Sequence, residues 1–213
     1  MAEEEKFSLH TLLFGGLHRC CLCDEENALG EDGLCDDCRK KLRLCIAPAP
    51  PPPLDGLTAG IIYNEDTSSV FYRFKAKEKL YLGGFLAQFM SIPPEWQGEM
   101  LVPVPLHPWR QYTRGYNQSH ELALYLSAAY GIPVCAPLLT KVRRTSDQKK
   151  LNAKERAKNL HKAFQAAPEA AGRRIILVDD VTTTGATLSA CAQALKKAGA
   201  IKVYAATAAC VMR

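Results

Sequence analysis

The segment that most restricts how this chain can fold is residues 174–187, where an apolar run leads into two acids and a threonine-rich turn. The run is continuous and contains β-branched residues, which is typical of a strand buried on both faces: Ile175, Ile176, Leu177 and Val178. Asp179 and Asp180 follow, and then comes the turn: Thr182, Thr183, Thr184, Gly185, Ala186 and Thr187. A helical apolar pattern follows and ends at Gly199. The segment therefore predicts a strand, a turn and a helix in succession.

Further strands and helices are predicted on both sides of this unit. Apolar runs predict strands at 60–63, 100–102 and 201–205, and helical spacing predicts helices over 78–91 and 118–130. Strands that alternate with helices in this way indicate a parallel sheet in an α/β domain. The chain has 213 residues, of which 47% are hydrophobic and 23% charged, enough for one domain with a small appendage. We expect the α/β domain to span residues 55–213.

The threonine-rich turn has the chemistry of a phosphate site. Ligands of open α/β sheets bind at the carboxyl ends of the strands, and free N–H groups at a helix start attract anions. Two carboxylates beside such a cradle would repel a phosphate, so they must serve another part of the ligand, such as ribose hydroxyls, directly or through Mg²⁺. A plain helix cap of threonines with two solvated aspartates is the alternative. The Gly-x-x-x-x-Gly-Lys-Ser/Thr and Gly-x-Gly-x-x-Gly motifs are both absent from the sequence.

Residues 175–187 resemble the signature of the phosphoribosyltransferases, which bind phosphoribosyl pyrophosphate (PRPP). The resemblance narrows to the ComF family of competence proteins through residues 102–106, 110 and 114–118, through Lys75, and through a spaced set in the basic region: Thr145, Gln148, Leu151, Arg156, Asn159 and Phe164. It implies a type I phosphoribosyltransferase fold whose members are linked to DNA uptake in natural transformation. It also implies that residues 182–187 hold the 5′-phosphate and that Asp179 and Asp180 hold the ribose hydroxyls.

Two arginines after the strand at 100–102 suit a pyrophosphate site. Arg110 and Arg114 offer forked guanidinium groups, which match phosphate oxygens in pairs, although a solvated surface role is the alternative. With Lys75 they are the candidate catalytic residues, acting by positioning the leaving group and stabilising its charge. We expect Tyr116 and Asn117 to have a structural role, packing and tying the loop.

The N-terminal residues 1–46 form a cysteine-rich module. Cys20 and Cys23 make one C-x₂-C knuckle, Cys35 and Cys38 make another, and eleven residues separate the two knuckles. Two such pairs complete a tetrahedral zinc site, which would supply folding free energy to a segment too small for much core of its own. Free thiols without metal and a redox pair are the alternatives. We expect thiols and metal rather than disulfides, and we see no obvious partner for Cys45. Cys21 lies between two of the knuckle cysteines and is the alternative ligand.

A proline-rich linker and a basic segment complete the sequence. Five prolines in residues 48–53 predict a stiff extended linker over 47–54. Residues 141–162 carry nine Lys/Arg against two Asp/Glu. Such a run is often a solvated helix face; the other interpretations are a lid over the diphosphate and a surface for single-stranded DNA, for which the candidate residues are Lys149, Lys150 and Lys154.

These observations lead to a ComF-like protein that binds Mg²⁺ with PRPP and carries structural Zn²⁺. Two functions stay open: a phosphoribosyltransferase, and a non-catalytic accessory module that handles single-stranded DNA and retains the PRPP site. Other DNA-uptake proteins are candidate partners. No apolar run approaches the roughly 18 residues that cross a bilayer, and the acidic N-terminus is unlike a secretory signal, so we expect a cytoplasmic protein without membrane insertion.

Overall fold

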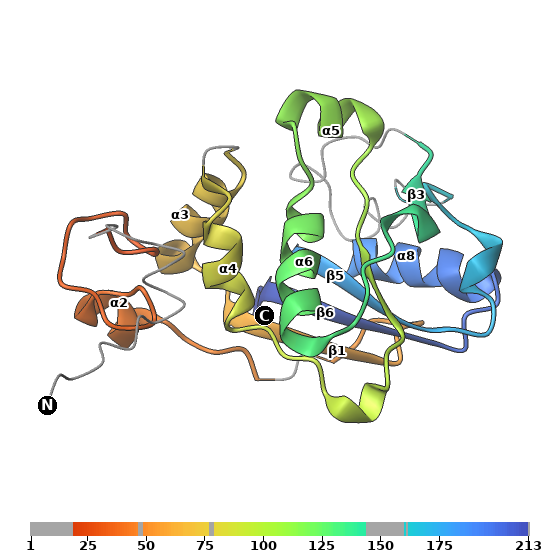
Figure 1. Ribbon diagram of the computed structural model, residues 1–213, viewed down its shortest axis with the longest axis horizontal. Coiled ribbons are helices and arrows are strands. Elements are labelled where there is room, and N and C mark those ends of the chain that lie inside the picture. Colours follow the sequence, from red (N-terminus) through yellow and green to blue (C-terminus); the bar gives the residue numbers. More distant parts are fainter. Residues whose placement is uncertain (1–18, 47–48, 77–78, 144–159, 161, 213) are drawn as a thin grey trace, which may run out of the picture.

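The computed structural model describes residues 19–46, 49–76, 79–143, 160 and 162–212. Its centre is a parallel sheet with the strand order β1-β6-β5-β2. The strands are β1 (Gly56–Ile62), β2 (Met100–Pro103), β5 (Arg174–Thr182) and β6 (Lys202–Cys210). A second, two-stranded antiparallel sheet joins β3 (Leu139–Lys141) to β4 (Phe164–Ala166). The predicted α/β class and parallel sheet are confirmed (Figure 1).

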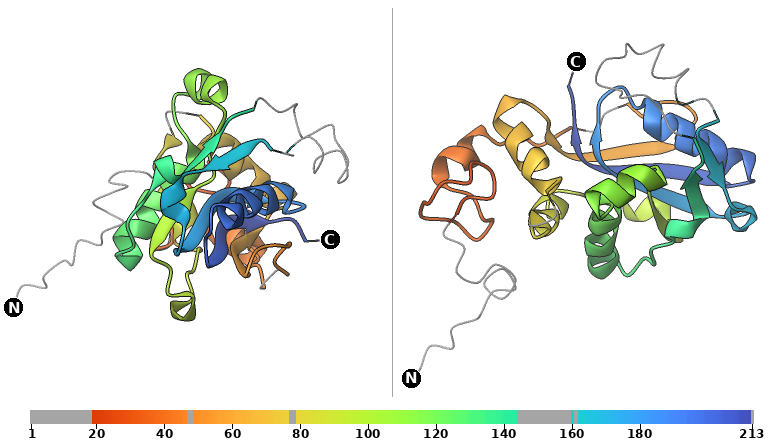
Figure 2. Two further views of the ribbon diagram at one scale, coloured as in Figure 1. Left: turned by 90° about the vertical axis from the view of Figure 1, so that its right-hand side faces the viewer. Right: turned by 90° about the horizontal axis from the view of Figure 1, so that it is seen from above.

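Helices cover both faces of the parallel sheet (Figure 2). The α-helices are α2 (Asp36–Lys41), α3 (Glu65–Phe74), α4 (Leu82–Ala87), α5 (Pro108–Arg114), α6 (Gln118–Tyr130) and α8 (Ala186–Lys197), and the 3₁₀ helices are η2 (Pro94–Trp96), η3 (Ala136–Leu138) and η5 (Pro168–Ala170). The helix predicted over 118–130 is confirmed at both ends. The helix predicted over 78–91 is wrong in length, since α4 has six residues. Its Gly83 and Gly84 lower helix propensity and let the Tyr125 ring approach closely.

The pleat of β5 divides the hydrophobic core between the two faces of the sheet. Ile176 and Val178 pack into one cluster with α3, α4 and α6, whereas Ile175 and Leu177 pack into the other with α8. All four side chains are fully buried. Side chains alternate across a strand, so a continuous apolar run serves both layers at once. The strand is therefore held firmly on both sides, and its carboxyl end is a rigid base for Asp179 and Asp180.

The cysteine-rich module packs against the α/β domain. Cys20, Leu22 and Leu34 are buried in the same hydrophobic cluster as Phe71 and Phe74 of the α3 region. Residues 43–45 pair with β1 in antiparallel fashion, through Cys45 N–H to Gly60 O (2.9 Å) and Ile62 N–H to Arg43 O (2.8 Å). The boundary at 47–54 stays a prediction, but the two parts share one core.

Two expectations about this region are wrong. Residues 51–54 form a turn rather than an extended spacer, with Leu54 N–H donating to Pro51 O at 3.0 Å. Cys45 is paired with Cys210 in a disulfide whose Cα atoms are 6.7 Å apart, although we expected no disulfide and no partner for Cys45. The two cysteines are 165 residues apart and meet because residues 43–45 and β6 both pair with β1.

Within the described residues, no helix is long and apolar enough to span a membrane.

Candidate functional site

Two carboxylates and their partners lie at the carboxyl end of β5. Asp179 Oδ1 accepts a hydrogen bond from Ser119 Oγ at 2.9 Å, near the start of α6. Asp180 Oδ1 accepts from the N–H of Val181 at 2.7 Å, and its Oδ2 lies 3.4 Å from Lys75 Nζ. Lys75 is the C-cap of α3, directly after the last helical residue, Phe74. The structure therefore brings together three predicted residues and adds Ser119, which the sequence analysis missed.

The carboxylate pair is electrostatically poised to receive a positive charge. Burial, followed by the charge of neighbouring Asp180, raises the pKa of Asp179 from 3.8 to about 7. Ser119 and Lys75 oppose this rise by stabilising the ionised carboxylate. The pKa of Asp179 lies near neutrality because burial and the neighbouring carboxylate outweigh the nearby ammonium of Lys75. A divalent cation or a set of hydroxyl donors would supply what the pair lacks.

The threonine-rich turn connects these acids to α8. Thr182 is the last residue of β5 and is buried, Thr183 and Thr184 lie in the turn, and Gly185 precedes the first residue of the helix, Ala186. Gly185 has a φ of +72°, which side-chain-bearing residues rarely adopt. Thr187 follows in the first helical turn. This strand–turn–helix order is the one predicted, and it directs the N-terminus of a 12-residue helix at the turn.

The proline-rich segment packs directly on this turn. A Cβ added to Gly185 would collide with the Pro51 ring. Ser189, one turn into α8, donates a hydrogen bond from its Oγ to Pro52 O. Pro51 and Pro52 of the predicted linker therefore form one wall beside the threonine-rich turn, which the sequence alone did not indicate.

The predicted arginines lie on α5, beyond the end of β2. Arg114 Nη1 donates to Gln118 Oε1 at 2.6 Å, and Arg110 is exposed. Burial lowers the pKa of Lys141, and the guanidinium of Arg110 lowers it further, whereas Asp179 opposes the change. Tyr116 and Asn117 have the structural roles we expected. Asn117 caps α6 and donates to Val104 O at 3.0 Å, and Tyr116 packs edge-on against Phe74.

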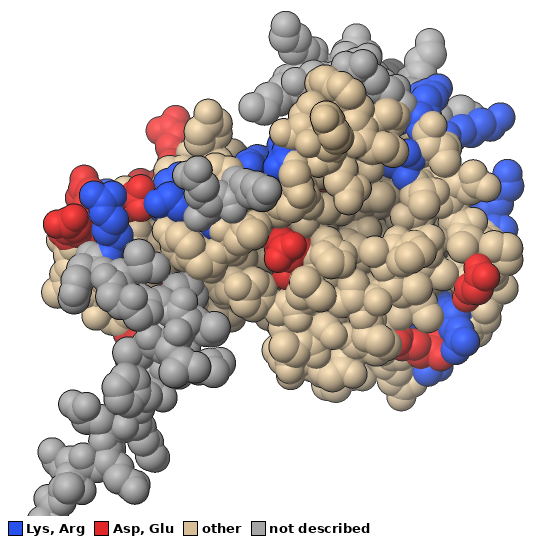
Figure 3. All heavy atoms as spheres, turned by 45° about the horizontal axis from the view of Figure 1, so that its top comes forward, with Lys and Arg blue, Asp and Glu red and all other residues tan. Residues whose placement is uncertain are grey.

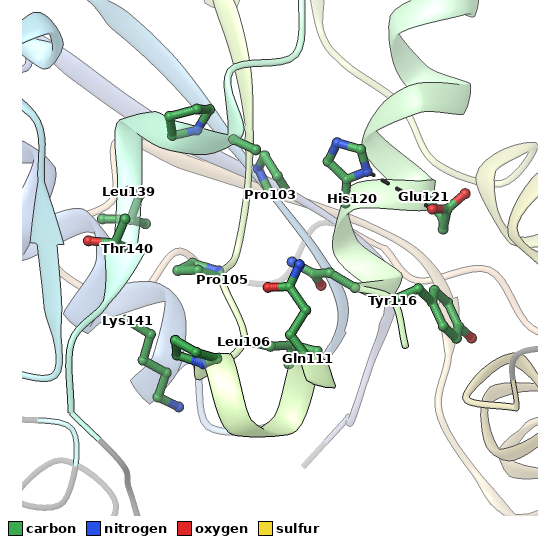
Figure 4. A pocket seen from close by; sticks show the side chains of 14 residues that line it. Pro103, Pro105, Leu106, Gln111, Tyr116, His120, Glu121, Leu139, Thr140 and Lys141 are labelled. Carbon is green, nitrogen blue, oxygen red and sulfur yellow. Dashed lines mark ion pairs between the residues drawn. The ribbon is translucent and has the colours of Figure 1, made fainter. Parts of the chain in front are cut away.

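A pocket of about 460 Å³ lies beside this region, between the loop after β2, α5, α6 and β3 (Figure 4). Prolines form much of its wall, and Gln111, Asn117, His120, Thr140 and Lys141 add polar groups. His120 and Glu121 lie 4.0 Å apart on its α6 side. The volume is within the usual range for small-molecule sites. Sequence reasoning did not find this pocket, because η3 and β3 meet the loop after β2 only through the fold.

The four knuckle cysteines converge at the far end of the molecule. The Sγ atoms of Cys20, Cys23, Cys35 and Cys38 all lie within 4.8 Å of one another, and Cys21 is outside the cluster. A tetrahedral zinc ion with bonds of about 2.3 Å needs sulfurs roughly 3.8 Å apart, so the donor set and its spacing fit this metal. Burial raises the pKa of the Cys23 and Cys38 thiols. Burial also raises the pKa of Cys20, but the N–H groups of Cys23, Cys35 and Leu22 outweigh it and lower that pKa to about 7. A thiolate is the form that binds metal.

One arginine ties this cysteine module to the acidic site. Arg73 Nη2 donates to Cys21 O and Leu22 O at 2.6 and 2.8 Å, and its Nη1 lies 3.1 Å from Asp24 Oδ1. Ser69, one turn earlier on α3, also donates to Leu22 O at 2.8 Å. Lys75 is the C-cap of the same helix, so the module holds the helix whose capping residue reaches Asp180. The candidate DNA-binding residues Lys149, Lys150 and Lys154 lie outside the described residues.

Comparisons with known proteins agree with this architecture. A family model described as "Phosphoribosyl transferase domain" matches residues 114–212, which include α6, the acidic pair and the threonine-rich turn. The fold and the site thus define a phosphoribosyltransferase-type domain joined to a four-cysteine module.

Curated relatives match most of the chain. Competence protein F of Haemophilus influenzae is 30% identical over 212 residues, covering 85% of this chain and 92% of that protein. DNA utilization protein YhgH of Escherichia coli K12 is 29% identical over 211 residues (86% and 93%), and competence protein ComFC of Bacillus subtilis is 29% identical over 192 residues (85% and 73%). The chain belongs to the competence protein F family.

Proposed function

We propose that this protein binds Mg²⁺ and PRPP at the carboxyl end of β5. The observation that carries the proposal is the joining of an acidic pair to a threonine-rich helix start at the end of a buried parallel strand. Asp179 and Asp180 would hold the ribose hydroxyls and Mg²⁺, which prefers oxygen ligands. The turn from Thr182 to Thr187 would hold the 5′-phosphate through backbone N–H groups and hydroxyls.

Three cations are assigned to the pyrophosphate: Lys75, Arg110 and Arg114. Lys75 already lies 3.4 Å from Asp180, so its ammonium sits beside the position proposed for the ribose ring. The two guanidiniums come from α5, the helix that follows β2 along the chain. Strand β2 is paired with β5 in the sheet. Their forked donors suit the oxygens of a diphosphate. The 5′-phosphate and the pyrophosphate would thus be held by different strand ends.

The reaction that such a site supports is pentosyl transfer to a nitrogen nucleophile. The nitrogen attacks the anomeric carbon of PRPP, and the bond from that carbon to the pyrophosphate oxygen breaks with its electron pair leaving on pyrophosphate. The attacking nitrogen releases one proton to solvent. Lys75, Arg110 and Arg114 would stabilise the charge that grows on the leaving group, and Mg²⁺ adds further charge neutralisation when bound.

Calorimetry on paired variants tests the proposal. The double variant Asp179→Asn with Asp180→Asn should bind Mg²⁺–PRPP at least tenfold more weakly than the parent, or about 1.4 kcal/mol. The control is Glu65→Gln with Asp66→Asn, an adjacent acidic pair that is exposed at the start of α3. Equal affinity in all three proteins would show that the carboxylates of β5 serve the fold and not a ligand. A screen for pyrophosphate release over bases and amines then asks whether turnover occurs.

A second candidate function is a non-catalytic accessory that handles single-stranded DNA. It is favoured by the nine basic residues among residues 141–162 and by the names of the relatives, which refer to competence and DNA utilization. Lys149, Lys150 and Lys154 would contact phosphates. In either function we propose that Cys20, Cys23, Cys35 and Cys38 hold one structural Zn²⁺, which their convergence supports.

A further inference from the structure

Two of the nine cysteines, Cys45 and Cys210, are joined in a disulfide. The other seven are free thiols. Four of these converge within 4.8 Å of one another, in an arrangement that suits a metal and requires reduced sulfur. The same molecule therefore holds an oxidised pair and a cluster that must stay reduced. Disulfides of proteins in reducing compartments are mostly transient, catalytic or redox-sensing.

The two sulfurs of this bond differ in access. Cys45 is partly exposed and lies between Leu44 and Ile46, which are 62% and 84% exposed. Cys210, the last residue of β6, is only 2% exposed. On the face shown in Figure 3, the cysteine module carries charged side chains of both signs and faces solvent. A soluble thiol can therefore attack the bond at Cys45, and Cys210 is the sulfur that leaves.

The segment that carries Cys45 has little buried surface of its own. Two main-chain hydrogen bonds, of 2.9 and 2.8 Å, tie residues 43–45 to Gly60 and Ile62 of β1. Residues 43, 44 and 46 are exposed. The rest of the module is docked separately, by Arg73 and by its buried apolar side chains. Because a segment of this kind opens at a low cost in free energy, reduction frees residues 43–46 while the module stays docked.

The buried sulfur lies beside the threonine-rich turn. Cys210 is the register partner of Thr182, the residue that ends β5. The next residue, Val211, donates its N–H to Thr182 O at 3.0 Å, and the N–H of Tyr63 donates to Cys210 O at 2.7 Å. The disulfide therefore fixes the end of β6 against the strand end from which the threonine-rich turn begins.

We propose that the Cys45–Cys210 pair is a reversible redox site, opened by a dithiol, and that its reduction weakens the hold of the threonine-rich turn on PRPP. One thiolate of the dithiol attacks Cys45 Sγ, the bond to Cys210 breaks, and its electron pair leaves on Cys210 Sγ, which takes up a proton. The second thiol of the reductant attacks the reductant's own sulfur in the mixed disulfide and releases Cys45, which takes up the second proton. The dithiol ends as a disulfide, so two electrons have passed to the protein. The effect on PRPP rests on the proposed function, whereas the redox site does not.

Differential labelling tests the redox site without any ligand. The intact protein is equilibrated with increasing dithiothreitol and quenched in acid, its free thiols are alkylated with one label, and its remaining disulfides are reduced and given a second label. Mass spectrometry should show Cys45 and Cys210 passing together from the second label to the first, before the protein unfolds or loses zinc. Replacing dithiothreitol with oxidised glutathione should restore the bond. The control Cys135→Ala, which removes a free cysteine outside the four-cysteine cluster, should behave as the parent does.

Hydrogen exchange and calorimetry test the consequence of reduction. Amide exchange at residues 43–46 and 210–212 should become at least about tenfold faster, and Mg²⁺–PRPP binding should become about threefold weaker. Cys45→Ala should match the reduced parent with or without dithiothreitol, while Cys135→Ala should respond to the reductant as the parent does. Dithiothreitol also binds zinc, but an effect through the four-cysteine module would appear in Cys45→Ala as well, which separates the two causes.

Two outcomes would overturn the redox site: a pair that stays bonded until the protein unfolds, and a pair that does not bond in oxidised glutathione. Equal exchange rates and equal PRPP affinity before and after reduction would overturn its coupling to the threonine-rich turn. If the parent binds no PRPP in either state, the proposed function fails and the effect on PRPP fails with it. Labelling and hydrogen exchange still decide the redox site in that case.

Discussion

Asp179→Asn should make the folded protein more stable at mildly alkaline pH. The folded-state pKa of this carboxyl is raised from 3.8 to about 7, so between these values the folded chain keeps a proton that the unfolded chain has released. The contribution of the protonated Asp179 to the free energy of unfolding is therefore fully present below about pH 4 and is lost as the pH rises toward 7. The shift of about three units corresponds to an upper bound of about 4 kcal/mol.

A smaller gain is expected in practice. Asp179 keeps some contact with solvent, and part of its pKa shift comes from the neighbouring charge of Asp180. We therefore expect the variant to gain about 1–2 kcal/mol in free energy of unfolding, or roughly 2–8 °C in Tm for a chain of this size. The asparagine can still accept the hydrogen bond from Ser119. Urea unfolding at about pH 8 and about pH 5 measures the change, and the advantage of the variant should shrink at the lower pH.

A second aspartate provides a control of opposite sign. Burial raises the pKa of Asp55, but hydrogen bonds from Lys196, Lys202 and the N–H of Val203 outweigh it and hold that pKa at about 2. Asp55→Asn should therefore destabilise the fold at neutral pH, and the loss should fade as the pH falls from 3.8 toward 2. If Asp179→Asn is neutral or destabilising at about pH 8, the carboxylate pair is not under electrostatic tension and the reasoning about its role is refuted.

Three more predictions concern the metal, the link between modules and the basic segment. Protein purified without added metal should contain about one zinc per chain by elemental analysis. Cys35→Ser should lose the zinc and expose the cysteine module to proteolysis. Metal-free protein whose cysteine module resists proteolysis would contradict the zinc site. Arg73→Gln removes the bonds that hold α3 to the cysteine module, and Lys75 caps this helix, so the variant should bind Mg²⁺–PRPP at least about threefold more weakly. The control is Arg39→Gln, whose ion pairs with Asp32 and Asp36 lie within the module; its calorimetric affinity should be unchanged. Replacing Lys149, Lys150 and Lys154 with glutamine should reduce the slope of log affinity against log salt for single-stranded DNA by roughly two units, measured by fluorescence anisotropy. An unchanged slope would favour a lid role for the segment, and the same variant should then lose affinity for PRPP.

The sequence predicted those parts of the site that are contiguous in the chain. The order of strand, acids, threonine turn and helix over residues 174–187 is visible as a pattern because each part has its own period or residue type. The cysteine cluster was predicted for the same reason, since the spacing within each knuckle already places two thiols together.

Contacts between distant segments were not predictable in this way. Ser119 and Asp179 are 60 residues apart, and a serine near a helix start gives no sign of the carboxylate it will meet. The signal that could have found Ser119 is its position two residues after Asn117, in the first turn of the helix predicted over 118–130. The pairing of Cys45 with Cys210 and the packing of Pro51 on Gly185 likewise depend on which strands and turns the fold makes neighbours.

The central claim is that the carboxyl end of β5 is a site for PRPP with Mg²⁺. Calorimetric titration of the intact protein with PRPP, with and without MgCl₂, tests it most directly, with ribose 5-phosphate as the ligand that lacks the pyrophosphate. The account predicts one site per chain, tighter binding when Mg²⁺ is present, and weaker binding of ribose 5-phosphate, because Lys75, Arg110 and Arg114 would have no pyrophosphate to hold. Absence of binding in the presence of Mg²⁺, or equal affinity for the two ligands, would contradict it.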